Sequence, residues 1–561
     1  MSLDSFLRRF ADGENPRQTE FLPFLCKEGR DERYIVNFRL AEVYLQRGDF
    51  AQARVFAERA WLLSFFAVET LKLYIKVCES IGELETIRSI YKQYGIKCAK
   101  EGKLNEAMEY FNRWQYTYMT YLNQDRYSYD IDILEAIEKM ALPYRWENPG
   151  KDYHRLDGRL RIAYLVHGMQ SVNGVLVKIN AMFARYHDQK QFEVTFFVPE
   201  TLKFVIKKNP QVHEFIKCCK DSGCSVEFGR YKSKKDKMVF VSRQIREYAP
   251  DILVTSAALA DFGHYFIAMT RPAPLVVSLL QGPPPQFTSP AFDYAISWSK
   301  HPMIDSPVDT SLVNIGIDLP DCPKEGLPSK ESLGVPEEAV VMVSAGRHPK
   351  FQDKDFWHVI LTLLERHPEV HYIAVGPTIS QVPYLDQKFL GEMTSRIQLL
   401  GWRPDCRELM TIADLLIDTF PSGGGHVLID AMAMGIPFVS FENNYLKQYD
   451  QTDWSVADEF VDIPELIVPR GDLTAMIEAA SRLITDNVYR KEMGALCSRE
   501  IRANMPSPEE GVRALEKVYI EKYRKFTGSK KEKMDYVKER TAGLPVGLKG
   551  FLSRFIRKLW R

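Results

Sequence analysis

The chain has 561 residues, of which 45% are hydrophobic and 26% are charged. These proportions are typical of a folded globular protein and exclude a fibrous or a disordered chain. At about 150 residues for a typical domain, the length suggests three or four structural units. Lys plus Arg and Asp plus Glu number 74 each, so the composition lacks the basic excess that indicates nucleic-acid binding.

Two further absences in the sequence bear on location. The nine cysteines are scattered, and the N-terminus has no basic segment followed by an apolar stretch, so we expect a reduced, cytoplasmic protein. No uncharged apolar run reaches the roughly 20 residues that a membrane-spanning helix needs. Association with a membrane surface stays open.

The first 143 residues show the hydrophobic periodicity of helices and no strand alternation. Residues 44–60 carry small residues around Gly48 in the pattern of a tetratricopeptide-repeat hairpin. Gly82 follows Gly48 by 34 residues, which is the expected period, whereas Gly102 follows only 20 residues later. We predict two or three degenerate repeats, with an irregular helical bundle as the alternative. Either one would offer a helical surface to a partner or to the next domain.

The pattern changes after a predicted linker at residues 144–158. Apolar runs that alternate with helical stretches then predict two successive parallel sheets with crossover helices, as in Rossmann-like α/β domains. The runs of the first sheet are 161–166, 192–198, 252–255, 275–280 and 294–298, and those of the second are 340–345, 372–375, 415–419 and 438–441. A Pro- and Gly-rich passage near residue 320 separates them. Ligands of such sheets bind beyond the carboxyl ends of the strands.

The most informative stretch is a glycine run, Gly423-Gly424-Gly425, between a predicted strand and a predicted helix. Glycines let the backbone approach a phosphate closely, and the free N–H groups at a helix start attract its charge. His426 could donate one more hydrogen bond there, and Asp430, one turn later, could accept hydrogen bonds from ribose hydroxyls. A flexible strand-to-helix loop is the alternative interpretation.

Here the sequence resembles a known family. The stretch PSGGGHVLIDAMAMGIPFVS, residues 421–440, is similar to the donor-binding element of GT-B glycosyltransferases. Residues 271–297 resemble a segment of the O-GlcNAc transferase family, including its SPINDLY-type bacterial members, and helical repeats also precede the catalytic part in that family. The resemblance covers most of the chain from Tyr34 to about Lys525. It implies an α/β fold with two Rossmann-like domains preceded by an all-α repeat domain.

The resemblance also assigns functions to the domains. It makes residues 1–143 a tetratricopeptide-like domain, 159–320 the N-terminal acceptor domain and 321–526 the C-terminal nucleotide-sugar domain. The implied activity is transfer of a sugar from a UDP-sugar to a protein acceptor. The helical repeats would bind that acceptor. The alternatives are a membrane-associated transferase acting on a lipid-linked glycan or cell-surface polysaccharide, and a nucleotide-binding repeat scaffold without activity.

Donor-site residues follow from the resemblance position by position. Arg347 and Lys350, after the first strand of the second domain, would bind the donor diphosphate, where cations offset the charge of the leaving group. We therefore expect neither a cofactor nor an obligatory metal. The full predicted donor set is Arg347, Lys350, Gly401, Trp402, Arg403, Ser422, Gly423, Gly424, Gly425, His426 and Asp430. In this set, Gly401 to Arg403 would hold the nucleotide base, and Trp402 either packs or stacks on uracil.

Departures from the family pattern concern the reaction itself. Retaining GT-B enzymes place a glutamate where this chain has Ser422, so the sequence favours an inverting enzyme. The first-domain histidine motif of the O-GlcNAc transferases is not reproduced around His167, and no motif identifies the acceptor-activating base. The candidates are Lys350 and two histidines, because histidine is the commonest general base. His167 follows the first strand, and His264 precedes Arg271. Each histidine could instead be structural.

The last segment, residues 527–561, is rich in basic residues. From Leu548 to Arg561, apolar residues recur at helical spacing, and Lys and Arg fill the opposite face without an acidic residue. This pattern is typical of an amphipathic helix that lies in an anionic membrane surface. We expect peripheral attachment to the inner face of the membrane; packing of this helix on the protein or on a partner is the alternative.

Overall fold

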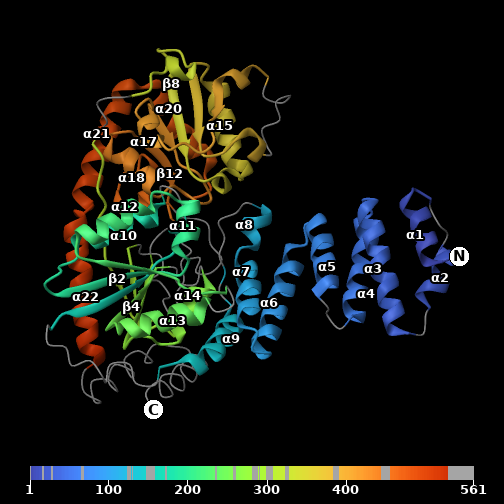
Figure 1. Ribbon diagram of the computed structural model, residues 1–561. Coiled ribbons are helices and arrows are strands. Elements are labelled where there is room, and N and C mark those ends of the chain that lie inside the picture. The colour runs from blue at the N-terminus through green and yellow to red at the C-terminus, as the bar shows by residue number, and fades with distance from the viewer. Residues whose placement is uncertain are drawn as a thin grey trace. The chain divides into compact units, whose positions relative to one another are not determined.

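The computed structural model of the chain describes all but a few loops and the last segment. The described residues are 2–14, 18–26, 29–64, 68–122, 128, 130–146, 158–170, 174–233, 237–256, 261–280, 289, 291–298, 308–321, 327–382, 391–443 and 455–527. They form two compact units, shown in Figure 1. Unit 1 comprises Met1–Lys97 and Glu109–Tyr121, and unit 2 comprises Cys98–Met108 and Leu122–Arg561.

Unit 1 is built from helices that follow one another through short turns. The helices of this part of the chain are α1 (Leu3–Ala11), α2 (Gln18–Leu25), α3 (Arg30–Gln46), α4 (Phe50–Leu63), α5 (Val68–Ser80), α6 (Leu84–Lys100), α7 (Leu104–Gln115) and α8 (Thr117–Leu122). Gly48, Gly82 and Gly102, which the repeat pattern placed in turns, have φ values of 74°, 71° and 72°. A residue with a side chain rarely adopts these angles. The helical hairpins are consistent with repeats.

The helices of unit 1 pack through small and aromatic residues. A Cβ added to Gly95 on α6 would lie 2.3 Å from the ring of Phe111 on α7, so only glycine lets these helices come this close. Trp61 Nε1 donates a hydrogen bond to the Tyr94 hydroxyl at 2.8 Å. The first contact joins the consecutive helices α6 and α7, and the second joins α4 and α6 through residues that are 33 apart in sequence, as expected for consecutive hairpins that share one core.

Unit 2 contains two parallel sheets. The first has the strand order β3-β2-β1-β4-β5-β6-β7, and the second has the order β10-β9-β8-β11-β12-β13. The strands of the first are β1 (Leu160–Leu165), β2 (Phe192–Val198), β3 (Ser225–Phe228), β4 (Ile252–Thr255), β5 (Leu275–Leu280), β6 (Tyr294–Ser297) and β7 (Thr310–Leu312). Those of the second are β8 (Val340–Ala345), β9 (Val370–Val375), β10 (Ile397–Leu399), β11 (Leu415–Ile417), β12 (Phe438–Phe441) and β13 (Ile467–Val468).

Helices connect these strands. The α-helices are α9 (Ile131–Ala141), α10 (Val175–Tyr186), α11 (Leu202–Lys208), α12 (Val212–Asp221), α13 (Lys237–Tyr248), α14 (Phe262–Met269), α15 (Lys354–Arg366), α17 (Cys406–Met410), α18 (His426–Ala433), α19 (Ala457–Phe460), α20 (Leu473–Thr485), α21 (Asn487–Asn504) and α22 (Pro508–Thr527). The 3-10 turns are η1 (Leu142–Tyr144), η5 (Glu331–Leu333), η6 (His348–Phe351), η7 (Ile379–Gln381) and η8 (Gly391–Arg396). The predicted pair of Rossmann-like sheets is confirmed.

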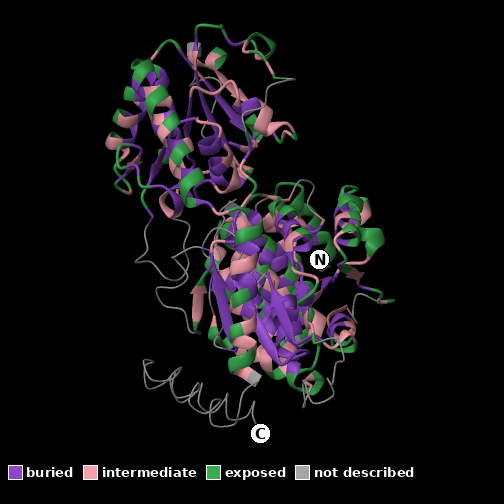
Figure 2. Ribbon diagram, turned by 90° about the vertical axis from the view of Figure 1, so that its left-hand side faces the viewer, coloured by how far each residue is buried: buried purple, intermediate pink, exposed green. Residues whose placement is uncertain are grey.

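The central strands are mostly apolar because helices cover both faces of a parallel sheet. All residues of β4, β5 and β6 are buried, and Figure 2 shows the strands of both sheets largely in the colour for buried residues. The sequence pattern located β2, β4, β5, β8 and β12 with the bounds that the structure has. It missed β3, β7, β10 and β13, which lie at the outer ends of the sheets and have two to four residues.

The last described helix, α22, belongs to the first sheet although it follows the second in sequence. Its residues Val512, Leu515 and Tyr519 are buried in the core beneath the first sheet, and the helix packs against α10. Figure 1 shows it beside the strands of that sheet. The predicted range 321–526 therefore includes a helix whose apolar face completes the other domain.

A buried polar cluster fastens α22. Glu516 is 3% exposed and accepts hydrogen bonds from the Asp188 amide at 2.7 Å and from Arg513 at 2.8 Å. Its Oε1 also lies 3.0 Å from His187 Nδ1, while Nε2 of that ring contacts the Tyr164 hydroxyl at 2.7 Å. These bonds join the last helix to the first strand of the sheet.

Two predicted segments lie largely or wholly outside the described residues. The linker predicted at 144–158 begins with Trp146, whose amide donates to the Thr270 carbonyl at 3.1 Å, but residues 147–157 are outside. The basic segment from residue 528 to 561, with its predicted amphipathic helix, is outside as well. Among the helices in the described ranges, none is long and apolar enough to cross a membrane.

We predict that Glu516→Ala lowers the free energy of unfolding by about 3 kcal/mol, because it leaves buried donors without an acceptor. Urea denaturation followed by circular dichroism measures the loss. Glu521→Ala, on the same helix but largely exposed, is the matched control and should change stability by less than about 1 kcal/mol. Equal effects of the two substitutions would show that the buried cluster does not fasten α22.

Candidate active site

The predicted donor loop, residues 422–425, is held by the buried carboxylate of Asp418. Oδ1 of Asp418 accepts a hydrogen bond from the Gly424 amide at 2.6 Å. Oδ2 accepts from the hydroxyls of Ser440 at 2.8 Å and Ser455 at 2.5 Å. Burial raises the pKa of Asp418, and the three donors partly offset this effect. A Cβ at Gly424 would lie 2.9 Å from Asp418 Oδ1, so the loop needs glycine here.

The loop opens into the start of α18. Gly425 is the N-cap of this helix, no side chain caps it, and a Cβ added to Gly425 would meet no atom within 4 Å. Ser422 is buried, and its carbonyl accepts from the Thr419 hydroxyl at 2.9 Å. A helix start without a capping side chain, facing open space, attracts an anion such as a phosphate.

Lys350 lies against this loop. It comes from η6, directly after β8, is only 9% exposed, and donates a hydrogen bond to the Gly423 carbonyl. Its charge also acts to lower the pKa of Asp418. Arg347, at the start of η6, is exposed. The structure therefore brings together Lys350 and the glycine run, which the sequence analysis assigned to one site from two separate stretches.

His426 is the first residue of α18. Burial, together with the nearby charges of Lys178 and Arg407, lowers its pKa to about 4, so the ring is neutral at pH 7. Its Nε2 is buried and has no hydrogen-bond partner in the described part of the chain. The ring centroid lies 6.4 Å from that of Trp298, which follows β6 of the first sheet. His426 thus offers one unused polar atom beside the loop.

Asp430, one turn along α18, is bound by an arginine that the sequence analysis missed. Arg407 Nε lies 3.1 Å from Oδ2 and its terminal nitrogen 2.9 Å from Oδ1. Burial raises the pKa of Asp430, and Arg407 counteracts that rise. No motif pointed to Arg407, because its partner lies 23 residues further along the chain. Whether Asp430 also binds ribose stays a prediction.

The predicted base-binding turn, Gly401 to Arg403, follows β10. The Gly401 amide donates to the Pro377 carbonyl at 2.9 Å, and its carbonyl accepts from the Gly376 amide at 2.8 Å. Trp402 is 62% exposed, so its ring is not a core residue. Arg403 forms a two-pronged ion pair with Asp405. The exposed indole is available for stacking on a nucleotide base, which is one of the two interpretations that the sequence left open for Trp402.

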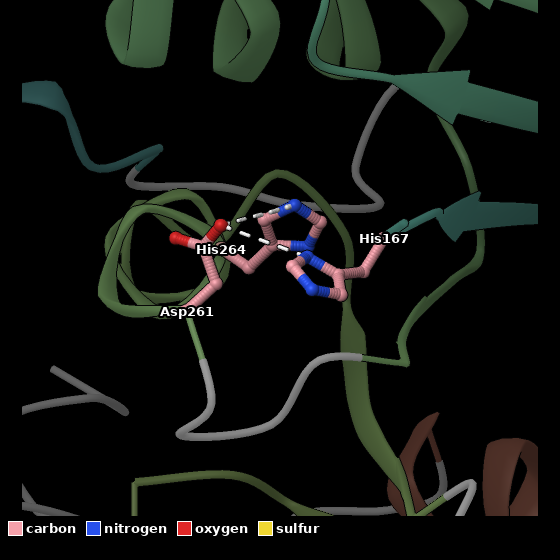
Figure 3. A group of neighbouring side chains, drawn as sticks. All are labelled: His167, Asp261 and His264. Atoms are coloured by element: carbon pink, nitrogen blue, oxygen red, sulfur yellow. Dashed lines mark ion pairs between the residues drawn. The ribbon is translucent and has the colours of Figure 1, made fainter. Parts of the chain in front are cut away.

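The two candidate base histidines lie together, as Figure 3 shows. His167 follows β1, and His264 is on α14; their ring centroids are 5.4 Å apart and their planes nearly perpendicular, at 82°. Both face Asp261, with 3.7 Å between His167 Nδ1 and Asp261 Oδ2 and 4.0 Å between His264 Nε2 and the same oxygen. The sequence analysis named both histidines separately but did not predict that they meet.

Asp261 is the residue that joins them, and it was missed. It is the N-cap of α14, with Oδ1 accepting from the Gly263 amide at 2.8 Å. Burial alone would raise the pKa of Asp261, but His264, His167 and Lys237 together with the Gly263 amide outweigh burial and lower it. Its only signal in the sequence was an aspartate directly before an apolar helical run.

The two histidines differ in environment. His264 is 3% exposed, and burial lowers its pKa to about 4. Its Nδ1 is buried and has no hydrogen-bond partner among the described residues. The side chain of His167 is 27% exposed. His167 is therefore the ring that a substrate could reach.

A buried contact with α9 supports α14 from behind. Tyr265, next to His264, donates a hydrogen bond to Glu138 on α9 and lies 2.8 Å from the Ser289 hydroxyl. Burial is the main cause that raises the pKa of Glu138 to about 7. The helix that carries Asp261 and His264 is thus held by a carboxyl group that ionises near neutral pH.

Comparison with known proteins identifies the domain that holds the second sheet. Residues 339–486, which contain Lys350 and the glycine loop, match the family described as Glycosyl transferases group 1. Among curated proteins, no sequence matches significantly. The part of the chain that holds the second sheet is a glycosyltransferase group 1 domain, which confirms the resemblance noted in the sequence.

Solved structures extend the likeness beyond that domain. A mutant of the Thermobaculum terrenum O-GlcNAc transferase matches with a TM-score of 0.56 and 15% identity, over 94% of this chain and 99% of that chain. The lipopolysaccharide outer core galactosyltransferase WaaB in its apo form matches with a TM-score of 0.41 and 15% identity, over 65% of this chain and 100% of that chain. The first of these confirms the GT-B fold with a preceding helical region.

We predict that Glu138→Gln makes the protein relatively more stable as pH rises. A carboxyl whose pKa is raised from 4.5 to about 7 by folding binds its proton more tightly in the folded state. Its contribution to stability is full below pH 4.5 and is lost as pH rises through 7. Glutamine does not titrate, so the variant should gain about 2 kcal/mol relative to the wild type between pH 5 and pH 8.

Urea denaturation at the two pH values measures this difference. Glu135→Gln, a more exposed position on the same helix that pairs with Lys139, is the control and should show no such gain. A constant difference between wild type and Glu138→Gln across this range would mean that folding does not raise the pKa of Glu138.

Proposed function

We propose that this GT-B protein is a glycosyltransferase that moves a sugar from a UDP-sugar to a hydroxyl of a protein acceptor. The observation that carries the proposal is the junction of Lys350 with the glycine loop at the uncapped start of α18. The glycine loop thus lies beside a buried cation, the start of a helix without a capping side chain and the unused Nε2 of His426. This set suits a diphosphate.

The proposed donor site supplies positive charge from the protein itself. As the bond between the anomeric carbon and the diphosphate oxygen breaks, negative charge builds on the leaving UDP. The Lys350 ammonium and the start of α18 stabilise that charge. We therefore propose that transfer needs no obligatory metal at the donor phosphates. Trp402 supplies an exposed aromatic ring for the nucleotide base.

For the acceptor half, we propose His167 as the general base. With Nδ1 turned toward Asp261, its Nε2 is left to accept the proton of the acceptor hydroxyl. The hydroxyl oxygen then bonds to the anomeric carbon, and UDP leaves from the opposite side, which inverts the configuration. Asp261 is a positioning residue in this step, because it acts through the imidazole rather than on the substrate.

Two finer parts of the proposal concern partners. The helical hairpins of unit 1 offer a surface for a protein acceptor, and the solved structure with the same fold is named an O-GlcNAc transferase. We also propose that residues 548–561 attach the protein to an anionic membrane surface. Sedimentation with vesicles that contain anionic lipid, lost when these residues are removed, tests the attachment.

The acceptor class can be measured directly. The pure protein is incubated with labelled UDP-sugars and with either whole-cell protein or a lipid extract. Label in protein supports the proposal. Label in the lipid fraction alone would replace the protein acceptor with a lipid-linked glycan, and failure to bind UDP in a calorimeter would leave only a repeat scaffold.

We predict that Lys350→Met reduces transfer at least about 100-fold, because a buried cation that stabilises the leaving group is lost while the side-chain volume is kept. Transfer of label and calorimetry with UDP measure the effect. Lys354→Met, which replaces an exposed lysine one turn further along, is the matched control and should have activity close to that of the wild type.

His426→Ala should also abolish transfer. Full activity of both Lys350→Met and His426→Ala would refute the donor site.

We predict that His167→Gln lowers kcat by a factor of about 100 or more and leaves UDP affinity within about twofold, since a base for the acceptor does not contact the nucleotide. Steady-state transfer assays and UDP calorimetry separate the two effects. His213→Gln, an exposed histidine on α12, is the control. If His167→Gln weakens UDP binding and keeps kcat, the residue serves the donor and is not the base.

A further inference from the structure

We propose that His167, Asp261 and His264 form a site for one divalent transition-metal ion of the zinc class. The three side chains offer one ligand atom each, and these atoms all lie within 4.8 Å of one another. They come from the end of β1 and from the first turn of α14. Asp261 and His264 are three residues apart, which places them on the same side of that helix.

The spacing of the three groups is the first argument. Distances of 3.7 and 4.0 Å from the two imidazoles to Asp261 Oδ2 are too long for direct hydrogen bonds. Ligands of a tetrahedral zinc ion lie about 2.1 Å from the metal, and thus about 3.4 Å from one another. Small side-chain rotations bring the observed cluster to that size, so one atom of cation size fits among the three.

The unused lone pairs are the second argument. The nitrogens that face Asp261, His167 Nδ1 and His264 Nε2, lie too far from it for a hydrogen bond, and the other nitrogen of His264, Nδ1, is buried without a hydrogen-bond partner among the described residues. Asp261 is fixed at Oδ1 by the Gly263 amide at 2.8 Å, which leaves Oδ2 toward both rings (Figure 3). A carboxylate held from behind and turned toward two imidazoles is typical of a metal-binding set.

The chemistry of the donors selects the ion. Two imidazoles and one carboxylate suit zinc, cobalt or ferrous iron, whereas magnesium and calcium prefer oxygen ligands alone. The nearby cation, Lys237, is paired with Glu200 at 2.7 Å, so its charge is offset. With Asp261 and Glu200 negative and Lys237 positive, the surroundings carry a net charge of about −1 that attracts a divalent cation.

Such an ion would inhibit the enzyme, a consequence that rests on the proposed role of His167 as base. An imidazole that gives its Nδ1 lone pair to a metal carries its proton on Nε2. It then has no lone pair to accept the proton of an acceptor hydroxyl. The donor site, built from Lys350 and the start of α18, would still bind UDP. Removal of the metal with a chelator would restore transfer.

Cobalt titration of the chelator-treated full-length protein tests the site without any substrate. Bound Co²⁺ with nitrogen and oxygen ligands in a tetrahedral or five-coordinate site gives visible absorption bands. We expect these bands in the wild type, with saturation near one ion per chain and competition by Zn²⁺. His264→Gln and Asp261→Asn should weaken binding at least about 100-fold, and the exposed control His213→Gln should leave it unchanged.

Absence of the bands in the wild type, or equal binding in wild type and His264→Gln, would overturn the proposal. If the buried His264→Gln or Asp261→Asn variant loses the circular dichroism spectrum of the folded protein, cobalt binding is measured with the partly exposed His167→Gln variant instead. Binding equal to that of the wild type would then overturn the proposal. UDP calorimetry with and without Co²⁺ should give equal affinities. Binding of Co²⁺ without inhibition of transfer by Zn²⁺ would uphold the metal site and count against His167 as the base.

Discussion

The hydrogen bonds of one buried carboxylate, Asp418, set the geometry on which the donor site depends. Asp418 directly follows β11 and accepts hydrogen bonds from the Gly424 amide, from the Ser440 hydroxyl on β12 and from the Ser455 hydroxyl. Because the group is buried, each of these donors must be in place for the carboxylate to be tolerated. The loop backbone is therefore held in one conformation, and Lys350 can bind its carbonyl while α18 begins in the open.

The two halves of the proposed site use charge differently. In the donor half, the cations Lys350 and Arg407 lie beside the carboxylates Asp418 and Asp430, so that the protein meets an incoming diphosphate without carrying a large excess charge of its own. In the acceptor half, a single carboxylate faces two imidazoles. That half can hold a proton or a cation, which explains why the same three side chains suit both a general base and a metal site.

Much of the fold could be predicted from sequence because burial on both faces leaves a plain signal. The strands β2, β4, β5, β8 and β12 are mostly apolar and were located with the observed bounds. The outer strands β3, β7, β10 and β13 are too short and too exposed to leave such a pattern. Gly424 could be predicted because a close backbone approach admits only glycine. Arg407 could not, since its partner Asp430 lies 23 residues away in the chain. The meeting of Asp261 with His167 could not either, since the fold brings His167 to it.

The position of α22 has a consequence for biosynthesis. Val512, Leu515 and Tyr519 complete the core of a sheet whose first strand begins at Leu160. During translation that sheet must wait, with an apolar face uncovered, until more than three hundred further residues have left the ribosome. Folding of this domain cannot finish strictly from the N-terminus onward. A chain that stops before Pro508 would keep every strand of both sheets and still expose the apolar surface that α22 covers, which favours aggregation.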